Sequence, residues 1–253
     1  MSHLLVDIDP PWSIFAQGDR TLLVTLDAPV SVANGQRCGQ AARALMKACL
    51  RGVVDIVPSF SSIAVHYQPR LFDSTTFKRL ASDVAQVINA QDTQAPQDGS
   101  TVIDIPVCYG GEYGPDLAGV ARHAGLTEED VIRLHAGTPL YVFMLGFAPG
   151  AAYMGMLDER LDIGRRDTPR TALPKGAVAI ANRQTIIYPN VSPGGWHVIG
   201  ITPIELFFPR QQPPTRIAPG DMVRFQPMSV QAFEKVMGQA DHMGESDDSG
   251  SVS

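Results

Sequence analysis

The sequence has 253 residues, 44% of them apolar, and carries 20 Lys and Arg against 26 Asp and Glu, a net charge of −6. The apolar content excludes intrinsic disorder of the whole chain, and no apolar run approaches the roughly 18–20 residues of a membrane-spanning helix. The acidic balance argues against a dedicated nucleic-acid-binding protein.

The start of the chain, MSHLLVDIDPPW, has neither a basic segment nor a continuous apolar stretch, so no signal peptide is predicted. Cys38, Cys49 and Cys108 form no CxxC pair. Scattered thiols in odd number are typical of a reducing compartment. We therefore expect a cytoplasmic protein without membrane segments.

The first part of the chain predicts an α+β domain over residues 1–92. Strands are indicated where apolar residues alternate, and helices where they recur at a spacing of three or four. The helical spacing is clearest in the Ala-rich segment whose predicted helix stops at Gly52. In chain order, the predicted elements are a strand at 20–26, a helix at 34–51, strands at 53–58 and 61–69, and a helix at 72–90.

A polar stretch at 93–100, with Pro and Gly and no periodic apolar residues, is the predicted linker. A strand at 101–109 follows, and then two short helices at 116–124 and 128–135. The second helix begins after Thr127 with three acidic residues, the pattern of a capped N-terminus.

Glycine and proline concentrate between residues 137 and 227, which hold 22 of the 43 in the chain. Short β-type runs with Gly/Pro corners are typical of an all-β barrel or sandwich, so a second domain is predicted over 101–237. Within it, 229–237 is the one helical stretch after the strands, and the acidic tail 238–253 is predicted to be disordered. The predicted strands of this region are 140–145, 177–181, 185–188, 197–199 and 222–225.

Most standard catalytic motifs are absent. The sequence contains no GxxxxGK[ST], no GxGxxG after a strand, no HExxH and no GxSxG. The six histidines have no metal-type spacing, so no metal site is predicted.

One dense segment, residues 143–203, combines features of a small-molecule cleft. It holds three arginines in the run RRDTPR (165–170), Lys175 at a corner, and an aromatic and a histidine beside a diglycine in SPGGWH (192–197). Arginine is the preferred fork-like partner of carboxylates and phosphates.

Each feature also has a plainer interpretation. Glycine and proline in an all-β domain usually mark turns. Arg165 and Arg166 would equally suit a solvated face, Trp196 could fill the barrel, and His197 could be an ordinary surface or core histidine.

The same segment closely resembles the KipI family, also called the allophanate hydrolase subunit 1-like family. Upstream, GD (18–19), VPSF (57–60) and IPVCYGG (105–111) fit less specifically. The segment departs from the family pattern at Ala151-Ala152, Ala177 and Asn182-Arg183, which alters the expected pocket lining. The matching motifs are GFAPGAAYMG (146–155), Arg166 with TPR (168–170), LPKGAVAIA (173–181), QTIIYP (184–189), SPGGW (192–196), and PGDMVRF (219–225).

The resemblance implies an N-terminal α+β domain and a C-terminal cyclophilin-like β-barrel. It further implies a subunit of an ATP-dependent 5-oxoprolinase, a hydrolase that opens the lactam of 5-oxo-L-proline to L-glutamate, inactive alone. The implied partners are a KipA-like (allophanate hydrolase subunit 2-like) protein and a LamB/YcsF-like subunit. Without a P-loop, the ATP would be bound unconventionally or by a partner.

On this basis Arg170 and Lys175 are expected to supply positive charge, and His197 to be the acid or base. Gln184 and the backbone N–H groups of Gly194 and Gly195 would donate hydrogen bonds to the substrate. The remaining predicted substrate-binding residues, which would wall the pocket, are Phe147, Pro149, Tyr153, Tyr188 and Trp196.

Two alternatives stay open at this point. Some members of the family inhibit a sporulation histidine kinase, which would make the chain a regulatory binding protein. Related domains form part of a biotin-dependent carboxyltransferase, which would make it a component acting on a biotinylated partner.

Overall fold

The computed structural model describes residues 11–90 and 102–244. The chain divides into two compact units, residues 1–100 and 101–253, which we call the N-terminal unit and the barrel unit. The predicted linker lies outside the described residues, so the predicted domain limits stay a prediction.

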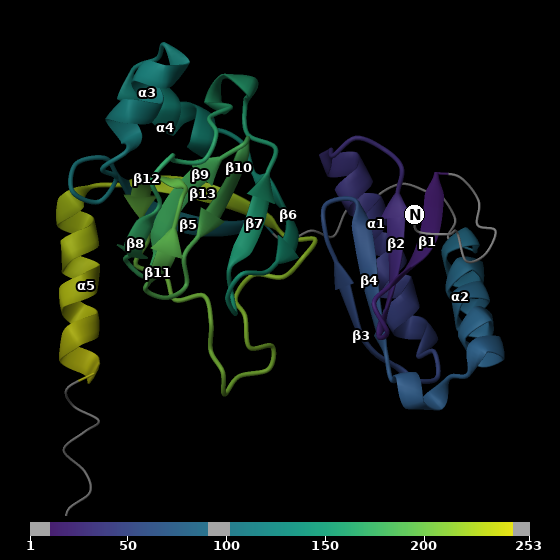
Figure 1. The fold of residues 1–253 in the computed structure, drawn as a ribbon. Coiled ribbons are helices and arrows are strands. Elements are labelled where there is room, and N and C mark those ends of the chain that lie inside the picture. Colours follow the sequence, from purple (N-terminus) through teal and green to yellow (C-terminus); the bar gives the residue numbers. More distant parts are fainter. Residues whose placement is uncertain (1–10, 91–101, 245–253) are drawn as a thin grey trace, which may run out of the picture. The chain divides into compact units, whose positions relative to one another are not determined.

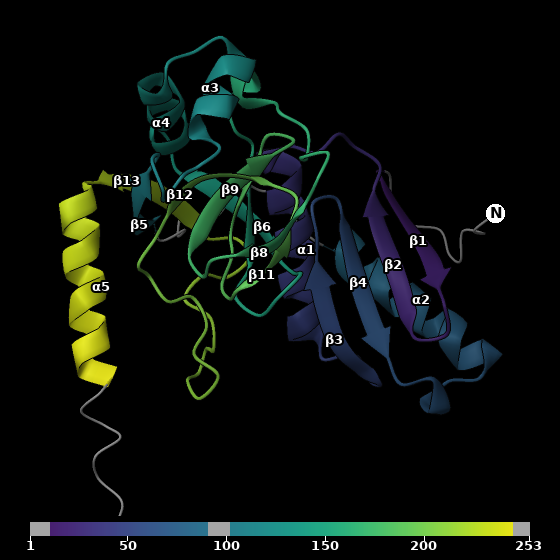
Figure 2. The same ribbon diagram turned by 60° about the vertical axis from the view of Figure 1, so that its left-hand side comes forward.

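The N-terminal unit is a four-stranded antiparallel sheet in the order β1-β2-β4-β3, with two helices on one face (Figure 2). The alternating side chains of β2 and β4 place Leu22, Val24, Ile63 and Val65 in one core with both helices. Its elements are β1 (Trp12–Gln17), β2 (Thr21–Leu26), α1 (Val32–Ala48), β3 (Val53–Pro58), β4 (Ser62–Tyr67), η1 (Pro69–Leu71) and α2 (Ser74–Asn89).

The expected order of strands and helices is therefore present in this unit, with β1 as an addition that the sequence did not indicate. The helix predicted to end at Gly52 ends earlier, at Ala48. Cys49 adopts the left-handed conformation (φ 46°) there and its N–H closes the last turn on Met46.

The barrel unit is a closed barrel in the order β10-β7-β6-β13-β5-β12-β9 (Figure 1). A barrel was expected, but the unit is not all-β, since α3, α4 and α5 belong to it. Its likeness to cyclophilin stays a prediction. Its elements are β5 (Val102–Tyr109), α3 (Leu117–Ala124), α4 (Glu128–Ala136), β6 (Leu140–Leu145), β7 (Ala152–Gly155), η2 (Glu159–Leu161), β8 (Arg170–Leu173), β9 (Ala177–Ala181), β10 (Gln184–Ile187), β11 (Ser192–Gly194), β12 (His197–Ile201), β13 (Met222–Met228) and α5 (Val230–Gly244).

The barrel closes through a parallel pair, β5 and β13, whereas its other neighbouring strands are antiparallel. Helix α4 begins as predicted, with the Thr127 hydroxyl accepting from the Asp130 N–H at 3.1 Å. Its buried His135 contacts the core through Phe225, whose ring stacks on the imidazole at 4.4 Å.

The disordered tail predicted from residue 238 is wrong over its first part, because α5 continues to Gly244. The helix is anchored near its start, where buried Phe233 packs on Tyr113 with ring centroids 4.8 Å apart. Residues 245–253 of the predicted tail lie outside the described residues.

Candidate functional site

A second layer of structure covers the outer side of the barrel wall. Successive side chains of β9 point to opposite faces, so Val178 and Ile180 lie in the barrel core while Ala177, Ala179 and Ala181 face outward. The two-stranded β8–β11 sheet contributes Leu173 of β8 to the same outer cluster, and Trp196, two residues after β11, is a further member. The small alanines leave room for these large side chains against the wall.

Four of the predicted aromatic residues gather in this outer layer. Tyr153 and Trp196 meet edge to face, with ring centroids 5.8 Å apart, and Phe147 meets Tyr188 in the same way at 6.0 Å. Trp196 and Tyr188 are nearly buried, whereas Phe147 is 61% exposed. Trp196 is therefore better interpreted as a packing residue than as a residue whose ring contacts a ligand. Phe147 is the aromatic residue of this layer most accessible to a ligand.

Glycine is required at one point of this layer. A Cβ at Gly194 would run into the Tyr188 hydroxyl and the Leu173 side chain, whereas one at Gly195 would meet nothing closer than 3.6 Å. Gly194 thus lets β11 approach the barrel wall and seat Tyr188.

Arg165 is the charged residue that the structure adds to this cluster. Its guanidinium carbon lies 5.9 Å from the centroid of the Trp196 ring, a cation–π distance. Burial raises the pKa of Tyr153 and of Tyr188, and the nearby Arg165 charge opposes that rise at both. Arg165 is exposed and forms no ion pair with any residue in the described ranges, so it is available to an anion.

Both chain neighbours of Arg165 are held by hydrogen bonds. The His197 Nε2 donates to the Gly164 carbonyl at 3.0 Å, and the Arg166 N–H donates to the Gly195 carbonyl at 2.7 Å. His197, the expected acid or base, therefore serves here to hold the arginine-bearing loop with its Nε2–H.

Arg170 and Arg166 meet on one buried carboxylate. Arg170 donates to both oxygens of Asp116, at 2.6 and 2.9 Å, and Arg166 donates to Oδ1 at 2.7 Å. The Val198 N–H adds a fourth bond at 2.8 Å. Asp116 is 8% exposed. The carboxylate thus links α3, β8, β12 and the arginine loop.

The electrostatics of Asp116 follow from these contacts. Burial by itself would raise the pKa of the carboxyl group, but the hydrogen bonds from Arg170 and Val198 and the charges of both arginines outweigh it and lower the pKa. Arg170 was predicted to supply positive charge to a ligand; in this structure its guanidinium pairs with Asp116 instead.

The remaining predicted residues lie around the same layer. Lys175 is paired with Glu205 at 2.8 Å, both side chains being 51% exposed. Gln184 is half-buried on β10, opposite Gly155 and Ala181 and on the same side as Tyr153 and Ile186. Pro149 is exposed in the loop before β7.

Sequence reasoning missed Asp116, and it counted Arg165 as one of three arginines suited to an anion without assigning it a role of its own. Asp116 had no signal, because its partners lie 50, 54 and 82 residues away. Arg165 had a weak one, as the first arginine of the run RRDTPR.

Over residues 11–90 and 102–244, no group of three or more His, Cys, Asp or Glu side chains has the geometry to hold a metal ion. The same residues include no helix with the length and hydropathy of a membrane span.

The chain matches the family described as the carboxyltransferase domain, subdomain C and D, over residues 12–217. It is 38% identical over 212 residues to the B subunit of 5-oxoprolinase from Escherichia coli O157:H7, covering 83% of this chain and 93% of that protein. It is 37% identical over 191 residues to the B subunit of 5-oxoprolinase from Bacillus subtilis strain 168, covering 72% of this chain and 78% of that protein.

Among solved structures, TTHA0988 is similar with a TM-score of 0.70 and 32% identity, over 83% of this chain and 40% of that one. The urea amidolyase of K. lactis shares the fold with a TM-score of 0.71 at 16% identity, over 91% of this chain and 16% of that one. The chain thus corresponds to less than half of either protein.

Proposed function

Because this chain belongs to the carboxyltransferase domain family, subdomains C and D, together with curated relatives named as the B subunit of 5-oxoprolinase, we propose that it is a subunit of a 5-oxoprolinase-type complex. The complex would open the lactam of 5-oxo-L-proline to L-glutamate with ATP. The chain would act with a KipA-like and a LamB/YcsF-like partner and be inactive alone.

The observation that carries this proposal is the extent of the similarity to the Escherichia coli O157:H7 protein, which reaches 93% of that protein's length. The family match also includes every residue of the outer layer between Phe147 and Trp196.

The chemistry of the outer layer suits the proposed substrate. 5-Oxoproline has one carboxylate and a small flat ring. The unpaired fork of Arg165 would bind the carboxylate, and Phe147 with the edge of Tyr153 would flank the ring. Gln184, half-buried on the same side of the wall, would donate to the lactam oxygen.

The proposed roles of the other predicted residues follow from their contacts. Arg170 and His197 would position the arginine loop, since both are engaged by internal partners. Lys175 would remain a cation for an anionic group, because a half-exposed pair with Glu205 is weak enough to exchange.

We propose that ATP is held mainly by a partner. Four of the five cations between residues 165 and 183, Arg166, Arg170, Lys175 and Arg183, already have carboxylate partners within the chain. ATP would phosphorylate the lactam oxygen and leave as ADP. A first water would add to the ring carbon and the C–N bond would break, giving an acyl phosphate with a free amine, which a second water would hydrolyse to L-glutamate and phosphate.

The test is activity of the assembled complex. The chain is purified with both proposed partners, and glutamate and ADP formation are measured with and without 5-oxo-L-proline. Arg165→Ala should raise the KM for 5-oxoproline at least tenfold, because a charge-assisted hydrogen bond contributes about 1.5–3 kcal/mol. Arg165→Lys should restore part of the affinity.

Arg122→Ala is the matched control, since this arginine is exposed on α3 and does not belong to the outer cluster. Absence of glutamate formation in the complete complex would overturn the function. If the complex is active and Arg165→Ala leaves the KM for 5-oxoproline unchanged, the proposed binding role of Arg165 is wrong while the proposed function stands.

The family description favours one second candidate, a carboxyltransferase component acting with a biotinylated partner. This candidate predicts that the chain and its KipA-like partner exchange carboxyl groups with free carboxybiotin, a reaction that does not depend on 5-oxoproline.

A further inference from the structure

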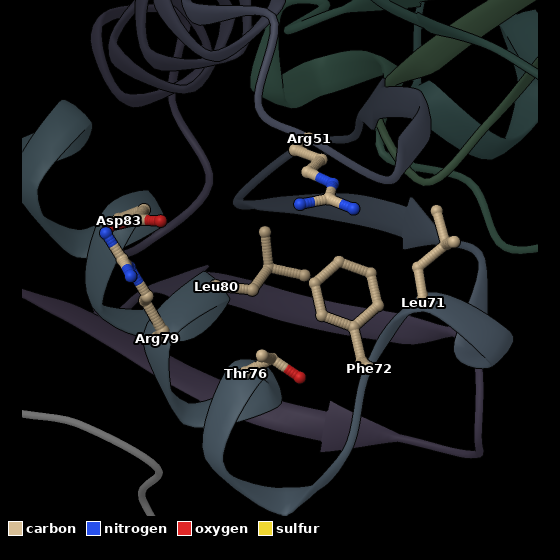
Figure 3. A pocket seen from close by; sticks show the side chains of 7 residues that line it. All are labelled: Arg51, Leu71, Phe72, Thr76, Arg79, Leu80 and Asp83. Carbon is tan, nitrogen blue, oxygen red and sulfur yellow. The ribbon is translucent and has the colours of Figure 1, made fainter.

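The N-terminal unit contains a cavity that the proposed function does not use. Its volume is about 440 Å³, within the range of sites that take drug-sized ligands and larger than an amino acid needs. Figure 3 shows its lining, which combines apolar and charged side chains: Arg51, Leu71, Phe72, Thr76, Arg79, Leu80 and Asp83.

The floor of the cavity is apolar and held in place. Phe72 packs edge to face on Tyr67, with centroids 5.4 Å apart, and lies so close to Gly52 that a Cβ there would meet its ring at 2.6 Å. The turn that carries Leu71 and Phe72 is fixed by bonds from their N–H groups to the carbonyls of residues 68 and 69, at 3.1 and 3.0 Å. Leu80, from α2, is 3% exposed and completes the floor.

The charged groups lie around this floor. In Figure 3 the Arg51 guanidinium extends over Leu80 and the Phe72 ring, while Arg79 lies beside Asp83 on another side. Neither arginine has an ion pair within 4.0 Å among the described residues. Two arginines against one aspartate leave the lining with one net positive charge, and Arg51 is the cation nearest the apolar floor.

We propose that this cavity binds a monocarboxylate with an unbranched apolar chain, its carboxylate on Arg51 and its chain on Phe72, Leu71 and Leu80. A carboxylate matches the single net charge and the fork of a guanidinium. An apolar chain removes the exposed faces of Leu71 and Phe72 from water. This proposal does not depend on the 5-oxoprolinase activity.

The test is a titration of the isotope-labelled full-length chain with butanoate, hexanoate and octanoate, followed by amide chemical shifts. Shifts should saturate and concentrate on residues 71–72 and 80. Affinity should rise about fifteenfold for each two methylenes, since each buried methylene contributes about fourfold. Octylamine, which has the same chain and the opposite charge, should not bind.

Variants separate the two parts of the site. Arg51→Ala should weaken octanoate binding about tenfold, whereas Arg70→Ala removes an exposed charge next to Leu71 outside the lining and should leave it unchanged. Leu71→Ala, at an exposed position, should weaken octanoate more than butanoate. The proposal is wrong if octylamine binds as well as octanoate, if both arginine variants weaken binding equally, or if the shifts do not map to the cavity.

Discussion

The two units bury polar groups differently. Among the described residues, Thr21 is the one buried polar side chain of the N-terminal unit, and it lies at the margin of burial. The barrel unit buries Asp116, His135, Thr185 and Thr202. The N-terminal unit is therefore stabilised mainly by apolar packing, while the barrel unit also relies on a few polar groups whose partners must all be in place.

The difference is open to measurement because each unit contains one of the two tryptophans, Trp12 and Trp196. Trp12→Phe leaves a fluorescence reporter in the barrel unit, and Trp196→Phe leaves one in the N-terminal unit. Urea unfolding of each background then follows one unit at a time.

The largest expected effect is on the buried carboxylate of the barrel unit. Asp116→Ala leaves two guanidinium groups and the Val198 N–H without their partner, and should lower the free energy of unfolding by about 3–5 kcal/mol. Asp158→Ala is the control, because its pair with Arg160 is exposed and is worth less than about 1 kcal/mol. Equal losses in the two variants would show that the barrel unit does not depend on Asp116.

In the N-terminal unit the largest loss should come from an apolar side chain. Leu45 on α1 is 1% exposed, so Leu45→Ala should cost about 3 kcal/mol through lost burial and the cavity left behind. The neighbouring Met46 is 48% exposed, and Met46→Ala should change stability by less than about 0.5 kcal/mol. Both are measured by urea unfolding with Trp12 as the reporter.

Acid should destabilise the barrel unit through His135. Thr185 donates its hydroxyl proton to the Ala179 carbonyl, so it accepts from His135 Nε2–H, and His135 Nδ1 accepts from the Tyr109 hydroxyl. This arrangement holds a neutral ring, and burial lowers its pKa to about 3.

Below pH 6.5 the unfolded chain takes up a proton that the folded chain excludes. The free energy of unfolding should therefore fall by about 1.4 kcal/mol per pH unit between pH 6.5 and about 3. His135→Gln cannot take up this proton, so its unfolding free energy should fall less steeply with acid when followed by Trp196 fluorescence. If the unfolding free energy of the unsubstituted protein and of His135→Gln fell equally steeply with acid, the inference that buried His135 is neutral would be contradicted.

The smallest effect concerns packing in the outer layer. Gly194→Ala should destabilise the barrel unit by about 1–3 kcal/mol, because the methyl group has no space beside Tyr188 and Leu173. Gly195→Ala, one residue on, meets only ordinary contacts and should change little. Thermal unfolding of the pair measures the difference, and a reversed order would contradict the described approach of β11.

The same division explains what the sequence could predict. In the N-terminal unit, apolar spacing indicated α1, α2 and three of the four strands, since each buries one side against a common core. β1 was missed because Phe15 interrupts the alternation of its apolar residues. In the outer layer, β8 and β11 were missed, because RTAL and SPG have no pattern of their own and form by pairing with each other.

The site was predictable to a similar degree. Phe147, Tyr153, Tyr188 and Trp196 do gather, as the resemblance implied. The cation of the site differs from the predicted one. Arg170 is paired with buried Asp116, whereas Arg165 is exposed and forms no ion pair with a described residue. Which of several arginines finds a buried carboxylate depends on contacts across 50 or more residues, and no local pattern encodes that.

The parallel pairing of β5 with β13 has a consequence for the order of events during synthesis. These strands join residues about 120 positions apart, as in the bond between Arg224 and Asp104. All strands of the N-terminal sheet have left the ribosome long before β13 is made, and a domain whose contacts are complete can fold while synthesis continues. The barrel must wait for its last strand, so its unpaired β5 edge and open apolar interior stay exposed while the residues between β5 and β13 are made, the interval in which a chaperone or an early-arriving partner would protect the chain best.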